Sequence, residues 1–457
     1  MTHKGIYLGQ GQDGKMLSYP GDRHLMLIGP NGSGKGARLL TQNVAFLTDR
    51  SLFIVDPKGE TAAMTIGLRR KLGDVVVLNP FGLHVDTHPA LGLASTGFNP
   101  LNALDPTSET FPDDCAGLAE AMIRIEGKDP HWAASAQDLL AALIMHEKLE
   151  NGGQATFGNV RRMLTEPTLY EILEDGKRGA PIGGLRHTAN FMSISDDEAL
   201  AAKASRFTES RDELDSIVST AITQTRFLDS RPIAADLGKG SGFRFGAMKR
   251  RTITVYLILP AKRLRTHSGW VRLIVQAALN DLYETMPDRS RPPVLMLLDE
   301  LPAAIGNLPI VEDAMGLARG YGVQLWPVVQ DLNQLKDLYE ARWETFIANT
   351  GALLTFAPRD FSTADYLSKL SGMKTEVVQS LSYGSSDQAS GSGSSENLSF
   401  STQGVPLFRP EALMGMAEGV ALCFSHLAQG PVICRLPAYW EMEALRPHLA
   451  PNPYYRT

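Results

Sequence analysis

Short, almost continuously apolar runs recur along the chain and alternate with longer segments of helical periodicity. The runs that read as buried strands are residues 24–28, 51–55, 74–78, 252–259, 294–298, 323–329 and 351–356, followed by a final pair at 421–425 and 431–435. A strand that is apolar on both sides needs a cover on both faces, which parallel sheets obtain from the helices connecting their strands. The sequence therefore predicts an α/β fold with a mostly parallel sheet.

Residues 104–207 interrupt this alternation, because they show helical patterns and no convincing strand. The clearest helix begins at Asp129-Pro130, a capping residue followed by proline at the first helical position, and continues through Trp132 with apolar residues at the helical period. We therefore expect an all-α domain inserted into the α/β domain. The predicted parts of the chain are residues 1–103, 104–207 and 208–457.

A Ser/Gly-rich tract occupies residues 380–401. Such a composition buries too little apolar surface to offset the entropy lost on ordering. We expect a flexible loop or linker there, to which the sequence assigns no chemistry.

A glycine-rich loop follows the first of these strands and precedes a helical stretch, the setting that a phosphate-binding loop requires. Its glycines let successive N–H groups turn toward an anion, and the following helix points its positive end at the same phosphates. Lys35 would act as a catalytic group on the β- and γ-phosphate oxygens. A glycine-rich turn with a chance lysine is the alternative. The residues expected to bind nucleotide are Gly29, Asn31, Gly32, Ser33, Gly34, Lys35, Gly36 and Ala37.

Gly36 stands where such a loop usually carries the Ser or Thr hydroxyl that ligates Mg²⁺. One metal ligand must therefore come from water or from a carboxylate elsewhere. The apolar run at 294–298 ends in Asp299 and Glu300. In motors of this kind the first acid holds Mg²⁺ through water, and the second polarises the attacking water as general base. The loop and the acidic strand end together predict hydrolysis of a nucleoside triphosphate.

Gln330 ends the next strand along the chain. A polar side chain in this place could contact the γ-phosphate or the water and report the loss of the phosphate, so we count it among the catalytic candidates. A glutamine that caps the following helix is the equally acceptable alternative.

The chain carries 44 Lys and Arg against 50 Asp and Glu, a net charge of −6. This balance excludes a protein that coats nucleic acid through bulk positive charge, because such proteins need a cationic excess to displace counterions. It is compatible with DNA held by a few basic loops. Three clusters near predicted strand ends qualify, at residues 69–71, 249–251 and 262–265, and a solvated surface is the alternative for each.

Neither disulfides nor membrane spans are expected. Cys115, Cys423 and Cys434 are odd in number and far apart, which fits buried, reduced thiols better than a disulfide framework or a zinc site. The longest apolar run, 253–260, is strand-sized, whereas a spanning helix needs about twenty apolar residues. We expect a cytoplasmic protein that reaches the inner face of the membrane only through partners.

Residues 56–60 (DPKGE) follow the second predicted strand directly. In this position the motif resembles the TraG/TraD-type coupling proteins of type IV secretion, the ATPases that feed DNA into conjugation machines. The resemblance extends over essentially the whole chain. Further features that agree are the loop ending in Lys35-Gly36, the insertion led by Trp132, the acidic pair 299–300, the segment 319–322, the run around Gln330, and the stretch 349–372 with Asp360 and Phe361.

The resemblance implies a RecA-like P-loop domain, interrupted by an all-α domain, that assembles as a homo-hexameric ring around a DNA channel. ATP and Mg²⁺ would lie between neighbouring subunits, and Arg319 would reach the γ-phosphate of the next subunit, where a guanidinium stabilises charge. A surface arginine paired with Glu312 or Asp313 is the alternative. The implied partners are single- or double-stranded DNA, a relaxase–DNA complex and the proteins of a type IV secretion channel.

Members of this family usually begin with membrane-spanning helices, whereas this chain reaches its glycine loop at residue 29. We expect either a soluble variant or a chain that lacks its anchor. The favoured function is an ATP-driven DNA translocase that couples relaxase–DNA to the channel. A motor for protein effectors and a nucleotide-binding adaptor without transport activity remain alternatives. Stimulation of ATPase activity by DNA would distinguish the DNA translocase from the motor for protein effectors. ATP hydrolysis above background would distinguish both motors from the adaptor.

Overall fold

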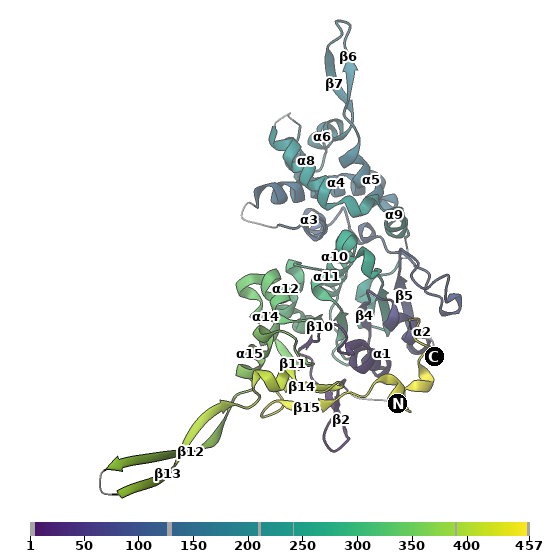
Figure 1. Cartoon of the computed structure of the whole chain (residues 1–457). Coiled ribbons are helices and arrows are strands. Elements are labelled where there is room, and N and C mark those ends of the chain that lie inside the picture. The colour runs from purple at the N-terminus through teal and green to yellow at the C-terminus, as the bar shows by residue number, and fades with distance from the viewer. Residues whose placement is uncertain (1–4, 126–129, 209–211, 241, 389–390, 455–457) are drawn as a thin grey trace.

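The computed structural model describes residues 5–125, 130–208, 212–240, 242–388 and 391–454 (Figure 1). Its strands of the main sheet are β1 (Ile6–Gln10), β2 (Met16–Tyr19), β3 (His24–Ile28), β4 (Leu52–Val55), β5 (Asp74–Leu78), β8 (Ile253–Leu257), β9 (Val294–Leu298), β10 (Val323–Val329), β11 (Thr350–Thr355), β14 (Val420–Ser425) and β15 (Val432–Arg435). They form one eleven-stranded sheet in the order β2-β1-β15-β14-β11-β3-β10-β9-β4-β8-β5.

The sheet is parallel from β11 to β5 and antiparallel from β11 to β2. All nine predicted strands are present within two residues of their expected limits, which confirms the mostly parallel α/β fold. The strands β1 and β2 were not predicted, because they are short and lie in a polar, glycine-rich segment. They extend the antiparallel edge beyond β15.

The helices lie on both faces of the sheet and in a separate lobe (Figure 1). They are α1 (Thr41–Phe46), α2 (Glu60–Leu72), α3 (Phe111–Met122), α4 (His131–Asn151), α5 (Phe157–Thr165), α6 (Leu185–Ser193), α7 (Glu198–Ser205), α8 (Asp212–Gln224), α9 (Arg231–Leu237), α10 (Ala261–Glu284), α11 (Leu301–Ala304), α12 (Pro309–Leu317), α13 (Leu332–Tyr339), α14 (Glu344–Ala348), α15 (Phe361–Leu370) and α16 (Pro410–Met414).

Alternate residues of β3 belong to two different hydrophobic cores. Leu25 and Leu27 pack in the core that includes α1 and α2, whereas Met26 and Ile28 pack in the core that includes α10. A strand buried on both faces has no polar side to present, which is why its sequence is apolar throughout. The second core continues without interruption into α3 and α4 of the helical lobe.

The inserted lobe differs from the prediction in two ways. It is not all-α, because it contains the hairpin of β6 (Leu169–Ile172) and β7 (Arg178–Gly183), a short and largely exposed pair that leaves no apolar run in the sequence. It also continues past residue 207, the predicted boundary. Helix α8 follows that boundary in the sequence, yet it packs against α4 and α5 of the lobe. Helix α4 begins at His131 directly after Pro130, and Asp129 lies outside the described residues.

The Ser/Gly tract is not a loop, and that prediction was wrong. It lies within the two-stranded ribbon of β12 (Met373–Gln388) and β13 (Gly391–Pro406), which projects from the body beside α15 and α16 (Figure 1). The strands pair through their backbones from Met373–Pro406 to Gln388–Gly391. Main-chain hydrogen bonds do not require apolar side chains, so composition alone gave no sign of this pairing.

The expectations for cysteines and membrane spans can also be compared with the structure. Cys115, Cys423 and Cys434 are buried and free, as predicted. Among the helices of the described ranges, none combines the length and apolarity needed to cross a bilayer.

Candidate active site

The glycine-rich loop leaves β3 at the carboxyl edge of the sheet and enters the helical turn η1 (Gly36–Leu40), which continues into α1. The N–H of Gly29 donates to the carbonyl of Val329 at 2.9 Å, which fixes the start of the loop to β10. Gly32 and Gly34 have φ angles of 78° and 80°. Side chains other than glycine rarely adopt this left-handed backbone, so these two positions explain why the turn needs glycine.

Several polar groups of the loop are free to bind a ligand. Within the described part of the chain, no hydrogen bond uses the N–H groups of Gly32, Gly34 or Lys35. The hydroxyl of Ser33 is buried and has no partner among the described residues. Buried polar groups are normally satisfied, and a concave set of N–H donors is a typical anion site. The loop therefore suits a phosphate, as its sequence predicts.

Three of the predicted catalytic residues meet directly. The ammonium of Lys35 lies 2.8 Å from Oε1 of Glu300, and Nε2 of Gln330 donates to Oε2 of the same carboxylate at 2.9 Å. The three side chains come from the ends of the neighbouring strands β3, β9 and β10. Glu300 has φ 51°, an unusual backbone for a glutamate that costs about 1 to 3 kcal/mol and is common at functional sites.

The two acids after β9 are held in different electrostatic states. Burial raises the pKa of the Asp299 carboxyl to about 6, against the opposing effect of Lys35. Burial also acts to raise the pKa of Glu300, but Lys35 and Gln330 outweigh it and leave this pKa below its ordinary value. Glu300 is therefore an anion at neutral pH, the form that can accept a proton from water.

Asp56 lies at the same edge of the sheet, and it is not among the predicted site residues. It follows β4, the neighbour of β9, and its Oδ2 accepts a hydrogen bond from the N–H of Ala62 at 2.8 Å. Burial raises the pKa of the Asp56 carboxyl to about 7, and the nearby carboxylates of Asp299 and Glu60 add to the increase. Lys58 in the same motif acts in the opposite direction and lowers the pKa of Asp299.

Replacing Asp56 with asparagine should stabilise the nucleotide-free protein, more at high pH than at low pH. The carboxyl ionises at its ordinary pKa of 3.8 when unfolded and at about 7 when folded. Between pH 3.8 and about pH 7 the carboxyl is ionised in the unfolded state but still protonated in the folded state. The parental protein therefore loses stability as the pH rises to about 7. Asparagine cannot ionise, yet its amide oxygen can still accept from Ala62. Thermal unfolding should show a gain larger by roughly 2.5 kcal/mol at pH 8 than at pH 5. An equal gain at both pH values would contradict this.

Arg319 does not lie near the glycine loop of the same chain. It is in the turn η7 (Ala318–Tyr321), before β10 and thus at the amino edge of the sheet, opposite the glycine loop. Its Nε lies 2.9 Å from Asp22, and its side chain is 51% exposed. The expected alternative partner Glu312 pairs instead with Arg342.

A cavity of about 160 Å³ adjoins the outer side of the glycine loop. The segment after β11 contributes Phe356 and Arg359, and the segment before β14 contributes Met416 and Glu418. Its apolar and charged lining next to a phosphate loop suits the nucleoside part of a nucleotide. The sequence gave no sign of it, because its walls are more than 300 residues from the loop.

Comparisons with known proteins agree with this geometry. The family model described as type IV secretory system conjugative DNA transfer matches residues 1–455. The conjugal transfer protein TraG of Escherichia coli is 28% identical over 83% of this chain, and the protein VirD4 of Rhizobium rhizogenes is 26% identical over 87%. The chain spans 60% of the length of that TraG and 56% of that VirD4.

Solved structures of the plasmid coupling protein TrwB share the fold. The complex of TrwB with the ATP analogue ADPNP has a TM-score of 0.66 and 15% identity, covering 96% of this chain and 91% of TrwB. The complex of TrwB with ADP and Mg²⁺ has a TM-score of 0.57 and 15% identity, covering 94% of this chain and 88% of TrwB. These similarities confirm the RecA-like P-loop architecture.

Proposed function

Because this chain belongs to the family of type IV secretory conjugative DNA-transfer proteins, we propose that it is an ATP-hydrolysing DNA translocase. It would act as the coupling protein that delivers a relaxase–DNA substrate to the secretion channel. TraG and VirD4, the relatives by sequence, and TrwB, the relative by fold, support this choice. The interactions with relaxase and channel proteins rest on these relatives.

One observation carries the catalytic part of the proposal. The loop, whose N–H groups at Gly32, Gly34 and Lys35 have no partner among the described residues, lies at the same sheet edge as a carboxylate held by Lys35 and Gln330. A triphosphate bound by the loop would take Lys35 away from Glu300, since phosphate oxygens compete for the ammonium. Glu300, freed from that ion pair, would accept the proton of the attacking water. Gln330, bonded to the same carboxylate, would respond to its movement.

The residues present also fit a magnesium ion. Mg²⁺ prefers oxygen ligands and retains several waters, so Asp299 with nucleotide phosphates can hold it although Gly36 has no hydroxyl. Within the described ranges there is no cluster of three or more His, Cys, Asp or Glu that could hold a metal alone, which agrees with binding together with the nucleotide. When bound, Mg²⁺ would neutralise charge on the β- and γ-phosphate oxygens. TrwB with ADP and Mg²⁺ supports this cofactor.

Arg319 fits a role across a subunit boundary. An exposed guanidinium at the sheet edge opposite the glycine loop cannot serve its own site, but it can face the loop of a neighbour in a ring. We propose a homo-hexameric ring in which Arg319 exchanges Asp22 for the γ-phosphate of the next subunit. A guanidinium in that place stabilises the charge on the transferring phosphoryl group.

The proposed function is tested by the ATPase rate of the purified chain with and without DNA. We expect turnover that rises at least tenfold with single- or double-stranded DNA, since a translocase couples its hydrolysis to its track. An ATPase rate that DNA does not change would favour a motor for protein cargo. ATP binding without hydrolysis would favour an adaptor. Either result contradicts the proposal.

The same assay tests the shared site. Rings of Arg319→Ala alone should be inactive, whereas mixing them with inactive Lys35→Ala subunits should restore part of the activity, because some interfaces then combine a normal Lys35 with a normal Arg319. No recovery at any mixing ratio would contradict a site shared between subunits.

A further inference from the structure

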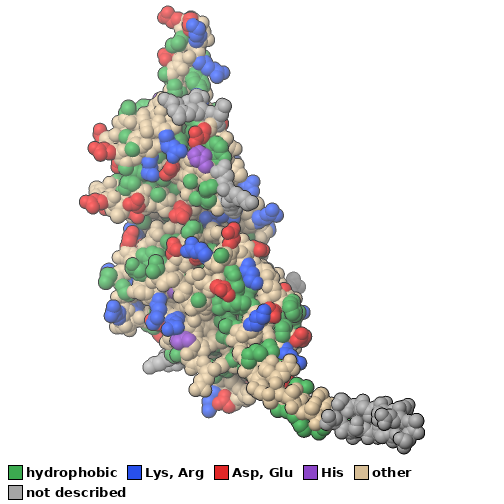
Figure 2. All heavy atoms as spheres, turned by 90° about the vertical axis from the view of Figure 1, so that its left-hand side faces the viewer, with side chains coloured by type: hydrophobic (Ala, Val, Ile, Leu, Met, Phe, Trp, Pro, Cys, Tyr) green, Lys and Arg blue, Asp and Glu red, His purple; other side chains and the backbone are tan. Residues whose placement is uncertain are grey.

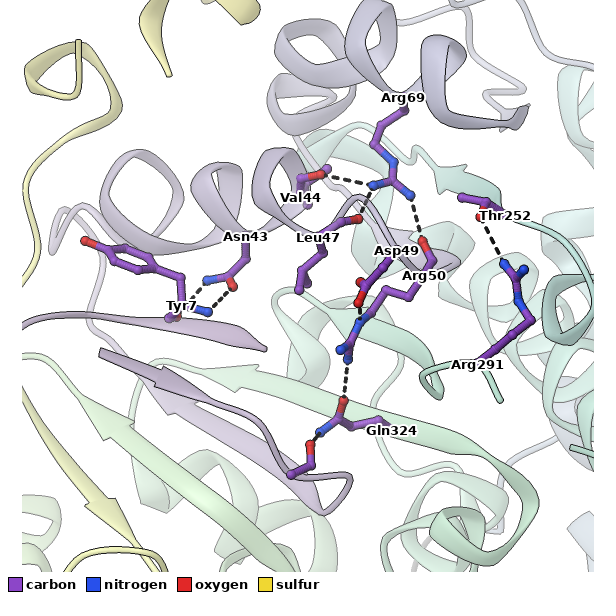
Figure 3. Close-up of polar contacts among 11 residues, drawn as sticks. Tyr7, Asn43, Val44, Leu47, Asp49, Arg50, Arg69, Thr252, Arg291 and Gln324 are labelled. Carbon is purple, nitrogen blue, oxygen red and sulfur yellow. Dashed lines mark hydrogen bonds and ion pairs between the residues drawn. The ribbon is translucent and has the colours of Figure 1, made fainter. Parts of the chain in front are cut away.

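The first basic cluster, 69–71, is largely a structural feature of the fold. Arg69 is buried, and its guanidinium donates to the carbonyls of Leu47 and Arg50 (Figure 3). Arg70 donates to the carbonyls of Leu91 and Gly92. The Arg69 guanidinium satisfies buried carbonyls and is not available to a phosphate, whereas the exposed Arg70 guanidinium is held by two loop carbonyls.

The second cluster, 249–251, is occupied in a similar way. Lys249 is buried, and its ammonium donates to the carbonyls of Leu282 and Thr285. Arg251 forms an ion pair with Asp74. Both this cluster and the first lie before strands, at the amino edge of the sheet and away from the nucleotide site.

The third cluster, 262–265, is different. Lys262, Arg263 and Arg265 are exposed on the first turns of α10, directly after β8 at the carboxyl edge. No ion pair with a carboxylate involves any of them in the ranges that the structure describes. By contrast, Lys and Arg mix with Asp and Glu over the described atoms of the face in Figure 2. These three neighbouring cations, unpaired among the described residues, therefore make a locally positive surface on a chain whose net charge is −6.

Two of these cations, Lys262 and Arg263, border a groove. It has a volume of about 390 Å³ and lies between the start of α10 and the loop after β5. Arg263 is held over the ring of Phe81, with its guanidinium carbon 5.4 Å from the ring centre. Lys262 and Arg263 line the groove from one side and Phe81 and His84 from the other, with Asp86 as an acidic wall residue.

The groove is connected to the nucleotide site through the DPKGE motif. Nε2 of His84 lies 3.0 Å from the carbonyl of Lys58, and the hydroxyl of Tyr454 donates to the same carbonyl at 2.8 Å. The motif thus contacts the groove wall through the backbone of Lys58, and it begins with Asp56 at the carboxyl edge of the sheet, where β4 lies next to β9.

We propose that this groove binds the sugar–phosphate backbone of a DNA strand, with Lys262 and Arg263 on successive phosphates. The proposal rests on the proposed function as a DNA translocase and places one track contact in this chain. Phosphate contacts fix the protein on DNA without reading its sequence, as a translocase requires. Phe81 positions the guanidinium of Arg263, and the contact of His84 with Lys58 places the groove beside the DPKGE motif.

The test is the affinity of the full chain for a fluorescently labelled single-stranded oligonucleotide, measured by anisotropy over a range of salt concentrations. The double variant Lys262→Ala/Arg263→Ala should bind at least tenfold more weakly at about 0.1 M salt. Its slope of log affinity against log salt should be smaller by about 1.4, since each lost phosphate contact on a single strand accounts for about 0.7.

Matched variants separate the groove from net charge. Lys71→Ala/Arg250→Ala removes two exposed cations from the other two clusters and should change the affinity less than twofold. Phe81→Ala keeps both charges but frees Arg263, so it should weaken binding with an unchanged salt slope. Thermal unfolding midpoints of all variants serve as the check that they are folded.

Each outcome bears on the proposal. If the parental chain binds DNA and Lys262→Ala/Arg263→Ala binds equally well, the groove assignment is wrong while the translocase remains. If the parental chain neither binds DNA nor is stimulated by it, the proposed function fails and the groove assignment with it. If a poly-glutamate peptide of equal charge displaces the oligonucleotide as well as unlabelled DNA does, the groove is a site for acidic protein instead.

Discussion

Replacing Lys35 with alanine should abolish ATP turnover. Lys35 belongs to the loop that would hold the phosphates, and its ammonium lies 2.8 Å from the proposed general base. Its removal takes away a phosphate ligand and also leaves the largely buried carboxylate of Glu300 without its main counter-charge. Loss of one such electrostatic contact typically reduces turnover by about 10² to 10³-fold. Binding of ATP should weaken as well.

The measurement compares ATPase rates and the affinity for a labelled ATP analogue. Lys177→Ala provides the matched control, because Lys177 is 78% exposed in the turn between β6 and β7 and pairs only with Asp175 among the described residues. It should behave as the parental chain. Parental turnover in Lys35→Ala would show that the glycine loop is not a phosphate site.

Replacing Glu300 with glutamine should stop hydrolysis while ATP binding becomes tighter. Glutamine keeps the shape of the side chain but cannot accept a proton, and loss of a general base costs about 10² to 10⁴-fold in rate. In the structure the Glu300 carboxylate forms an ion pair with Lys35. Glutamine removes that competing anion, so Lys35 becomes available to phosphate at lower cost. This opposite response of binding and turnover distinguishes a base from a structural carboxylate.

The comparison uses equilibrium binding and single-turnover hydrolysis of the same preparations. Glu284→Gln is a suitable control, because Glu284 ends α10 with a 61% exposed side chain. Joint loss of binding and turnover in Glu300→Gln would indicate that Glu300 only supports the loop, and an unchanged rate would exclude it as the base.

The strands and the main site could be predicted because each depends on local sequence. Strands buried on both faces must be apolar throughout, as β3 and β9 are. Side chains that follow parallel strands gather at one edge of the sheet, and this rule predicts that Lys35 and Glu300 lie close together. The closeness of Asp56 to Asp299 depends instead on β4 lying next to β9, and the sequence of neither strand determines that order.

Other features could not be predicted, because they depend on burial or on main-chain pairing. The ribbon of β12 and β13 pairs residues such as Ser385 and Ser394 through their backbones, whatever their side chains. The basic clusters look alike in sequence, yet Arg69 and Lys249 are buried among carbonyls while Arg263 is exposed beside a groove. Only the packed structure separates a structural cation from one that is free to bind.

The most direct test of the central claim is an experimental structure of the Glu300→Gln variant with ATP and Mg²⁺. The account predicts the triphosphate within the loop of residues 29–36, the γ-phosphate about 3 Å from the ammonium of Lys35, and residue 300 released from that ammonium. A nucleotide bound elsewhere, or Lys35 still paired with residue 300 while ATP is bound, would contradict it.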